Sequence, residues 1–324
     1  AANMWESEFH ELGHAQLITK FPGEGEALCN LLSAAIFNQL YNIDIDSAFG
    51  WSFDNQYWRG RDQSATNWMV THNFRMGNPM DISNTTLDEV RYQHRGYGKY
   101  VEIAALFGWE ALENYYTQVN IDYNNGITPE PESNIDDRIL KLSLAAGADL
   151  RPLIHFWGVH PQDNESLAQA MADNNLPASS LICNRLLHYK SIIPMNNQQF
   201  NEHAIEFFNG PVPPGGDPDY GNGWYNVWLP LYNSSHGDLA VIAMQNIIDT
   251  YFPSGCPCEN IAITGSSSVC INGAEMYSVP DVTGATYMWT VTGGTIVSGQ
   301  GTNSIQVIWN NGITGNVWIE QTNP

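Results

Sequence analysis

Apolar residues recur at steps of three and four through the first ~250 residues, which is the spacing of one face of an α-helix. Such faces pack against a hydrophobic core, so we expect several core-facing helices and one mainly α domain over residues 1–253. The positions that carry this pattern are Leu28, Leu31, Leu32, Ala35, Ile36 and Leu40; Val101, Ala104, Ala105, Trp109 and Leu112; Leu140, Leu142, Leu144 and Ala145; and Ile242, Ile247 and Ile248.

The period of the apolar positions changes to two after the turn-rich segment 254–259, which we interpret as a linker. Tyr287, Trp289 and Val291 alternate with polar or small residues, and the alternation continues at 305–309 and 317–319. This pattern is typical of half-buried β-strands. We therefore predict a small antiparallel β domain over residues 260–324.

The stretch from Val279 to Ile305 contains, in order, Val-Pro, Gly-Ala-Thr-Tyr, Trp, Gly-Gly and Gly-Gln-Gly-Thr-Asn-Ser-Ile. It resembles the Ig-like, polycystic-kidney-disease-type modules of proteins secreted by Bacteroidota. The resemblance implies a β-sandwich outside the cell, and we expect this module to be truncated. It also implies that Cys270 has lost a pairing partner; the alternative is a buried thiol that packs as a small hydrophobe.

Net charge narrows the classes of partner. The chain has 12 Lys and Arg against 34 Asp and Glu, which gives 12 − 34 = −22 over 324 residues. Phosphate backbones and anionic membranes repel such a chain, so we expect no nucleic-acid partner. Apolar runs stay below the ~18 residues that span a bilayer, so we expect no membrane insertion. The five cysteines are too few for a disulfide scaffold, and their pairing stays open.

A metal-binding pattern, His10-Glu11-Leu12-Gly13-His14, stands near the start of the sequence. On a helix, its two imidazoles lie on one face one turn apart and can bind a single metal ion. We expect this helix to stop at Phe21-Pro22-Gly23 and to bury a face made by Trp5, Phe9, Leu12 and Leu17.

A catalytic zinc ion needs a third protein ligand and an open position for water. The next predicted helix offers Glu24 and Glu26 in its first turn. We choose Glu26, because Asn30 follows four residues later and can accept a hydrogen bond from the second ring nitrogen of a ligand histidine. The residue four positions after Glu24 is Leu28, whose side chain cannot accept a hydrogen bond. Either glutamate taken singly is also explained as an acid favoured at a helix N-terminus.

These motifs resemble the gluzincin peptidases of the enhancin-like, mucin-degrading family. The resemblance continues at Gly25–Ser33, at Leu106–Leu112 and from Asp136 to Gly158. It implies a zincin-like catalytic fold, with zinc (Zn²⁺) ligated by His10, His14 and Glu26 and with Glu11 as general base.

One departure from that family is the length of chain before the motif. Such peptidases place a β-sheet lobe before the motif helix, whereas nine residues precede His10. The sequence begins Ala-Ala-Asn-Met-Trp, without an initiator Met or signal peptide, so we expect the natural start to lie upstream. The missing lobe is then supplied by upstream sequence, by further domains or by a partner chain.

Several other residues are candidates for binding roles. An oxyanion-stabilising side chain is expected, but His72, His94, Tyr97 and Tyr100 are each better explained as structural residues. Residues 217–223 and Asp44-Ile45-Asp46 offer oxygen ligands, so calcium is a candidate second ion. Aromatic clusters could stack on sugar rings, although core packing is the simpler explanation; they comprise Trp51, Tyr57, Trp58, Trp68, Trp224, Tyr225 and Trp228.

The sequence thus predicts a secreted, zinc-dependent endopeptidase that hydrolyses peptide bonds in glycoprotein, mucin-type substrates. The alternative is a cell-surface adhesin or glycan-binding protein that keeps a zincin-like scaffold without turnover. In both cases we expect the chain outside the cell, where it is either free or attached to the surface.

Overall fold

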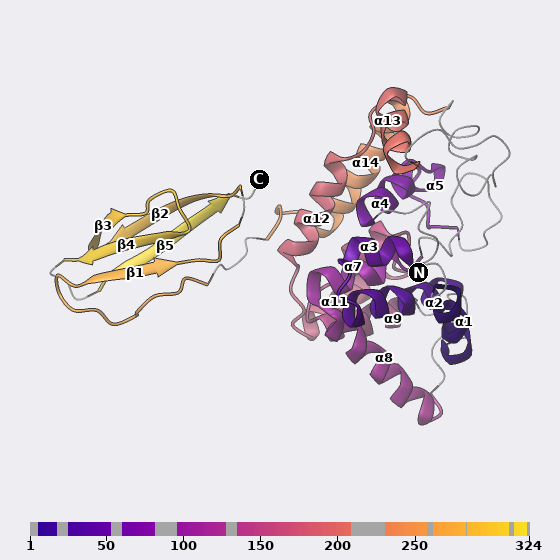
Figure 1. Cartoon of the computed structure of the whole chain (residues 1–324), viewed down its shortest axis with the longest axis horizontal. Helices are drawn as coiled ribbons and strands as arrows, with labels where there is room; N and C mark the ends of the chain where they lie inside the picture. Colours follow the sequence, from indigo (N-terminus) through magenta and orange to yellow (C-terminus); the bar gives the residue numbers. More distant parts are fainter. Residues whose placement is uncertain are drawn as a thin grey trace. The chain divides into compact units, whose positions relative to one another are not determined.

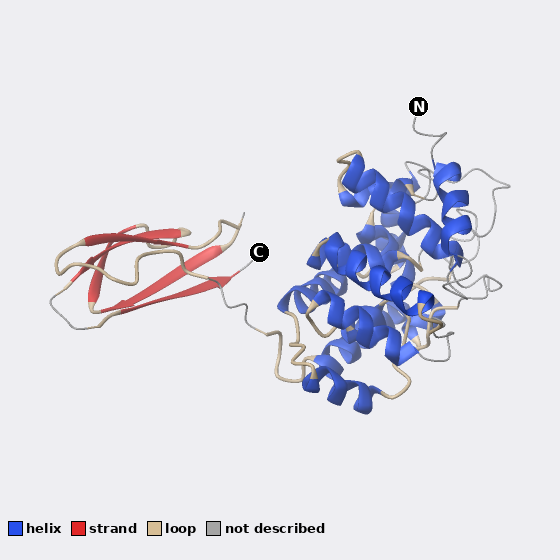
Figure 2. Cartoon of the chain, turned by 90° about the horizontal axis from the view of Figure 1, so that it is seen from below, coloured by secondary structure: helices blue, strands red, loops and turns tan. Residues whose placement is uncertain are grey.

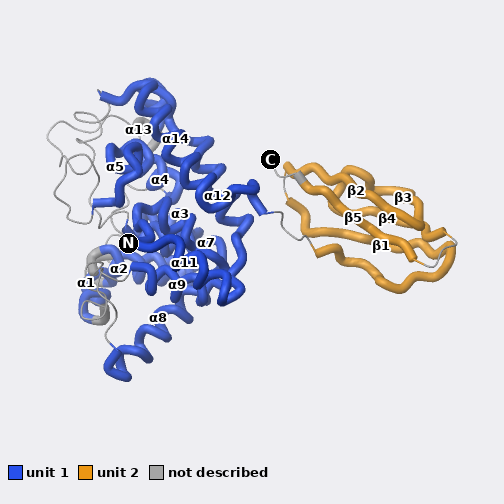
Figure 3. The backbone as a smooth tube through the Cα atoms, turned by 180° about the vertical axis from the view of Figure 1, so that it is seen from behind, with its two compact units in different colours: residues 1–257 blue, residues 258–324 orange. Residues whose placement is uncertain are grey.

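The computed structural model describes residues 6–17, 25–52, 60–81, 96–127, 135–208, 231–257, 262–282, 284–310 and 314–322. The chain divides into two compact units, Ala1–Pro257 and Cys258–Pro324, which Figure 3 shows in two colours. The division falls within the turn-rich segment 254–259.

The described elements of the first unit are helices (Figures 1 and 2). This confirms the prediction of a mainly helical region before an all-β one. The helices are α1 (Glu6–Leu17), α2 (Gly25–Ala35), η2 (Ile36–Leu40), α3 (Ile45–Trp51), α4 (Arg61–Met69), α5 (His72–Arg75), α7 (Gly98–Phe107), α8 (Trp109–Asn124), α9 (Ile135–Ala146), α10 (Arg151–Phe156), α11 (Asn164–Asp173), α12 (Ser180–Ser191), α13 (Asn197–Phe208) and α14 (Ser234–Tyr251).

Aromatic side chains join these helices in one core. The Phe156 ring of α10 stacks on the Tyr189 ring of α12 with centroids 4.7 Å apart. Trp68 of α4 is buried and donates from Nε1 to the carbonyl oxygen of Phe156 at 2.5 Å. Gly108 separates α7 from α8 with φ +84°, a left-handed conformation that favours glycine, so the chain changes direction there. The core also contains Leu31, Leu112 and Leu153, which come from the three segments where the resemblance to gluzincin peptidases is read from the sequence.

Some positions predicted to face the core are exposed. Leu40 is 70% exposed, because the chain changes from α-helix to π-helix at Ile36 and the wider turn moves later residues off the α-helical face. Phe37 takes the buried position instead. Ala105, Leu144 and Ile242 are also exposed on their helices.

An ion network centred on the buried Glu102 ties α3, α4, α7 and α12 together. Glu102 of α7 is fully buried and accepts from Arg61 Nη1 at 3.2 Å and from Arg185 Nη2 at 3.0 Å. The hydroxyl of Tyr189 also donates to Glu102. Asp46 binds the other side of Arg61 at 2.8 Å. Periodicity does not predict this network, because its members lie far apart along the chain.

A disulfide joins Cys183 of α12 to Cys256, with Cα atoms 5.5 Å apart and a sequence separation of 73. It fixes the chain after α14 to the helical core. Cys270 is exposed on the second unit, so the alternative of a buried thiol at that position is wrong.

The second unit is built from two antiparallel sheets, with strand orders β1-β4-β3 and β2-β5. Trp289 of β2 pairs with Ile319 of β5. The alternation read from the sequence corresponds to one buried face on each sheet, where Tyr287, Trp289, Ile305 and Val307 form a core. The strands are β1 (Ala274–Ser278), β2 (Thr286–Thr292), β3 (Gly294–Ser298), β4 (Ser304–Trp309) and β5 (Asn316–Thr322).

Candidate metal centre

The close packing of α1 on α2 depends on a glycine (Figure 1). Gly13 is buried, and a Cβ added there would lie 2.9 Å from the Cα and 3.0 Å from the Sγ of Cys29. Contacts that short do not occur between real side chains, so a larger residue would force the helices apart. The helix faces brought together by this contact carry His10 and His14 on α1 and Cys29 and Asn30 on α2.

The two histidines of the motif meet at their outer nitrogens. His10 Nε2 lies 3.0 Å from His14 Nε2, and the rings are nearly perpendicular with centroids 4.7 Å apart. Asn30 is fully buried, and its Oδ1 lies 2.9 Å from His10 Nδ1. Because an amide oxygen only accepts, His10 carries its proton on Nδ1 and presents the Nε2 lone pair to His14. This arrangement suits shared coordination of one metal ion.

A third side chain with a metal-ligating atom lies beside this pair. The ligand atoms of His10, His14 and Cys29 all lie within 4.8 Å of one another. Within the described part of the chain, no other group of three or more His, Cys, Asp or Glu side chains lies close enough together to hold a metal ion. Sequence reasoning missed Cys29, although its position next to Asn30 on the same helix was a usable signal.

Of the two glutamates predicted for the site, the structure describes the side chain of Glu11 but not that of Glu26. Glu11 is exposed on α1, where its carboxylate is open to water. Glu26 belongs to α2, but its side chain lies outside the described residues, as does Glu24, so Glu26 stays a prediction.

The buried face predicted for α1 needs correction. Leu12 is 49% exposed, whereas Phe9 packs edge-on against Phe37 with centroids 6.3 Å apart. The helix turns its Gly13 side to α2, because close approach there needs a residue without a side chain. Trp5, the side chain of Leu17 and the predicted stop at Phe21-Pro22-Gly23 lie outside the described residues.

Two tyrosines considered for oxyanion stabilisation are buried in the helical core. The Tyr97 hydroxyl donates to the carbonyl oxygen of Phe49 at 3.0 Å and accepts from Ser52 Oγ at 2.8 Å. Tyr100 is also buried. His72 is exposed at the start of α5, and His94 lies outside the described residues.

The carboxylates of Asp44 and Asp46, one of the two candidate calcium sites, already have partners within the protein. Asp44 caps α3 by accepting from the backbone nitrogen of Ser47 at 2.9 Å. Burial alone would raise the pKa of Asp46, but hydrogen bonds from Arg61 outweigh it and hold that pKa below its usual value. These carboxylates are therefore committed to a helix cap and an ion pair. Residues 217–223 lie outside the described part of the chain.

The aromatic residues considered for sugar stacking lie partly inside and partly outside the described residues. Trp68 is a core residue and Trp51 is 38% exposed. The rest lie outside the described residues: Tyr57, Trp58, Trp224, Tyr225 and Trp228.

A cavity of about 280 Å³ between α5, α10 and α14 holds a histidine pair. The rings of His155 and His160 lie 4.2 Å apart, and His155 Nδ1 is 2.9 Å from the Tyr251 hydroxyl. Burial, followed by the neighbouring His160, lowers the pKa of His155 to about 4. His155 is therefore neutral at physiological pH.

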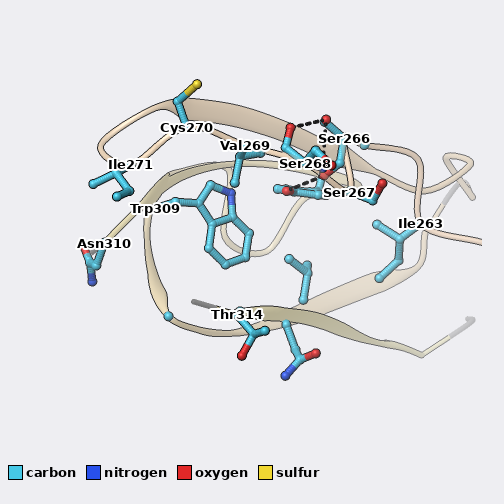
Figure 4. Close-up of a pocket in the computed structure, with 16 residues that line it drawn as sticks. Ile263, Ser266, Ser267, Ser268, Val269, Cys270, Ile271, Trp309, Asn310 and Thr314 are labelled. Atoms are coloured by element: carbon cyan, nitrogen blue, oxygen red, sulfur yellow. Dashed lines mark hydrogen bonds between the residues drawn. The ribbon is translucent and has the colours of Figure 1, made fainter. Parts of the chain in front are cut away.

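The β unit has a pocket of about 660 Å³. Figure 4 shows the ring of Trp309 between the serines Ser266–Ser268 and Thr314. Trp309 is almost fully buried, and its Nε1 has no acceptor among the residues that the structure describes. The pocket thus combines an aromatic ring with hydroxyl groups.

Comparison with known proteins accounts for the β unit. Residues 256–324 match the PKD-like domain family. The resemblance predicted for this module is confirmed at that level. No curated protein and no solved structure matches the chain, so the likeness of the helical unit to gluzincin peptidases stays a prediction. None of the helices in the described ranges combines the length and apolar character needed to cross a bilayer.

Proposed function

We propose that the helical unit is a zincin-like, zinc-dependent endopeptidase. The observation that supports it most is the meeting of His10 Nε2 and His14 Nε2 at 3.0 Å, with Asn30 accepting from the far side of His10. Metal-bound histidines usually donate their second ring N–H to such an acceptor. In this proposal His10, His14 and Glu26 hold the zinc ion.

The residues of this chain then have distinct roles in hydrolysis. Bound zinc would supply Lewis acidity, which activates water and polarises the scissile carbonyl. Glu11, on the same helix as both histidines, takes the proton from the attacking water and passes it to the leaving amine. Its exposure on α1 leaves the carboxylate accessible to water and substrate. Asn30 keeps His10 in the tautomer that has its lone pair on Nε2.

We assign glycoprotein substrates of the mucin type and an extracellular location to this activity. The substrate class rests on the family resemblance of the helical unit. The location is supported by the PKD-like domain and by the Cys183–Cys256 disulfide, since such bonds persist mainly in oxidising compartments.

Metal analysis tests the proposal directly. The purified chain should contain about one zinc per molecule, because His10 and His14 face one shared position. His10→Ala and His14→Ala should each lose the metal. His188→Ala is the matched control, because His188 is a half-exposed histidine that pairs with Asp62 at 2.8 Å and should leave zinc content unchanged. A wild-type chain without metal contradicts the proposal.

The second candidate function, an adhesin or glycan-binding protein, draws support from the pocket of the β unit. Its serine and threonine hydroxyls are of the kind that hydrogen-bond to sugar hydroxyls. Incubation with glycosylated and deglycosylated forms of one mucin peptide separates the two functions. Cleavage of either form favours the peptidase, whereas retention of the glycosylated form without cleavage favours the adhesin.

A further inference from the structure

The thiol of Cys29 is held against the two motif histidines by the packing of α1 on α2. Cys29 is fully buried, and its Sγ lies within 4.8 Å of the ligand nitrogens of both His10 and His14. We propose that Cys29 is a ligand of the same metal ion, so that the centre contains a His₂Cys set. This inference rests on the metal site of the proposed function.

The spacing of the three ligand atoms is close to that of a loaded site. Tetrahedral zinc with Zn–N of about 2.0 Å and Zn–S of about 2.3 Å places its ligand atoms roughly 3.3–3.6 Å apart. The two Nε2 atoms are 3.0 Å apart, and the thiol lies within 4.8 Å of a ring nitrogen of each histidine. Small side-chain shifts and ring rotations therefore bring all three ligands to one ion.

The alternative role for Cys29 is that of a small apolar residue filling the core. Its surroundings argue against that role, because its Sγ has two imidazole nitrogens as neighbours. Gly13 adds a second observation, since the absence of a side chain at that position leaves room for the thiol beside α1. Both features are expected of a ligand that must reach the histidines.

A thiolate ligand changes which metal ions the site selects. Soft sulfur ligands favour zinc and cobalt over magnesium, calcium and manganese. Three protein ligands are also the number that leaves one position open in catalytic zinc sites, so in this set Cys29 takes the third place and Glu26 stays outside the coordination shell. Cys29 therefore makes the centre a selective transition-metal site.

Cobalt(II) titration of the metal-free chain tests the assignment without relying on activity. The wild-type chain should bind about one equivalent and show a near-ultraviolet thiolate-to-cobalt charge-transfer band. Cys29→Ser should lose the band and weaken cobalt binding by about 10-fold or more, since even partners of ligands contribute that much. Cys270→Ser is the matched control, because its thiol is exposed on the β unit; this variant should keep the band.

The outcomes separate this inference from the proposed function. Binding of one cobalt without the band, and equally by Cys29→Ser, overturns the ligand role of Cys29 and leaves the metal site standing. A band that survives in Cys29→Ser belongs to another thiol and also overturns it. Absence of cobalt binding by the wild-type chain overturns both proposals. If Cys29→Ser does not fold, a Cys258→Ser/Cys270→Ser double variant decides, because Cys29 is then the thiol left outside the Cys183–Cys256 disulfide: a retained band supports the assignment and a lost band overturns it.

Discussion

Replacing Asn30 with alanine removes the amide oxygen that lies 2.9 Å from His10 Nδ1. The His10 ring then loses the contact that fixes its orientation and its tautomer. With the proton free to move to Nε2, a fraction of the molecules no longer present a lone pair to the metal. The variant therefore tests whether the hydrogen bond prepares His10 as a ligand.

The size of the effect follows from the contact. Loss of a partner that orients a metal-binding histidine costs about 10–100-fold in metal affinity. That range corresponds to about 1.4–2.8 kcal/mol of binding free energy. Because Asn30 is fully buried, the fold also loses about 1–3 kcal/mol from the N–H group left without an acceptor.

Competition against a chromophoric zinc chelator measures the affinity, and urea denaturation of the metal-free chain measures the loss of fold stability. Asn38→Ala is the matched control on the adjoining η2 turn. Asn38 Nδ2 donates to the carbonyl oxygen of Ile43 at 2.8 Å, and its Oδ1 accepts from Trp109 Nε1 at 2.6 Å. This control should lose stability but keep its zinc affinity.

Two results contradict the reasoning. If Asn30→Ala holds zinc as tightly as the wild-type chain, the hydrogen bond does not prepare His10. The preference for Glu26 over Glu24 then loses its spacing argument and rests on family resemblance alone. If Asn38→Ala weakens zinc binding as much as Asn30→Ala does, the loss reflects general destabilisation.

Three further predictions address chemistry, packing and pH. Glu11→Gln should keep its zinc while peptide turnover falls by ~10² or more, the range for a lost general base; equal turnover would exclude Glu11 from that role. Glu102→Gln should lower the free energy of unfolding by about 1–3 kcal/mol, because Arg61 and Arg185 each lose a fully buried carboxylate partner but keep Asp46 and Asp62. Asp62→Asn, which alters a half-exposed ion pair, should cost less than about 1 kcal/mol in the same urea assay. Burial lowers the pKa of His155 to about 4, so the unfolded chain binds its proton first as pH falls from about 6.5. Stability is then complete above about pH 6.5 and falls by up to about 3 kcal/mol towards pH 4; His155→Gln should reduce that slope in urea denaturation of the metal-free chain.

Local patterns in the sequence predicted the elements and part of the candidate site. Period-two alternation at Tyr287 and Trp289 corresponds to the buried face of β2, since neighbours in a strand point to opposite faces of a sheet. The four-residue spacing of His10 and His14 corresponds to nitrogens 3.0 Å apart, because one helical turn separates them. The same logic failed at Leu40, where the helix widens into a π-turn that periodicity does not encode.

The sequence by itself determined the features that depend on residues a few positions apart, namely the helical first unit, the alternating strands of the second and the paired histidines. Tertiary structure alone decided which faces meet. Gly13 brings Cys29 to the histidines, and Glu102 joins Arg61 and Arg185 from helices 41 and 83 residues away. Such contacts arise from the sum of many weak packing interactions over whole helix faces, and the spacing of residues along the chain does not record that sum.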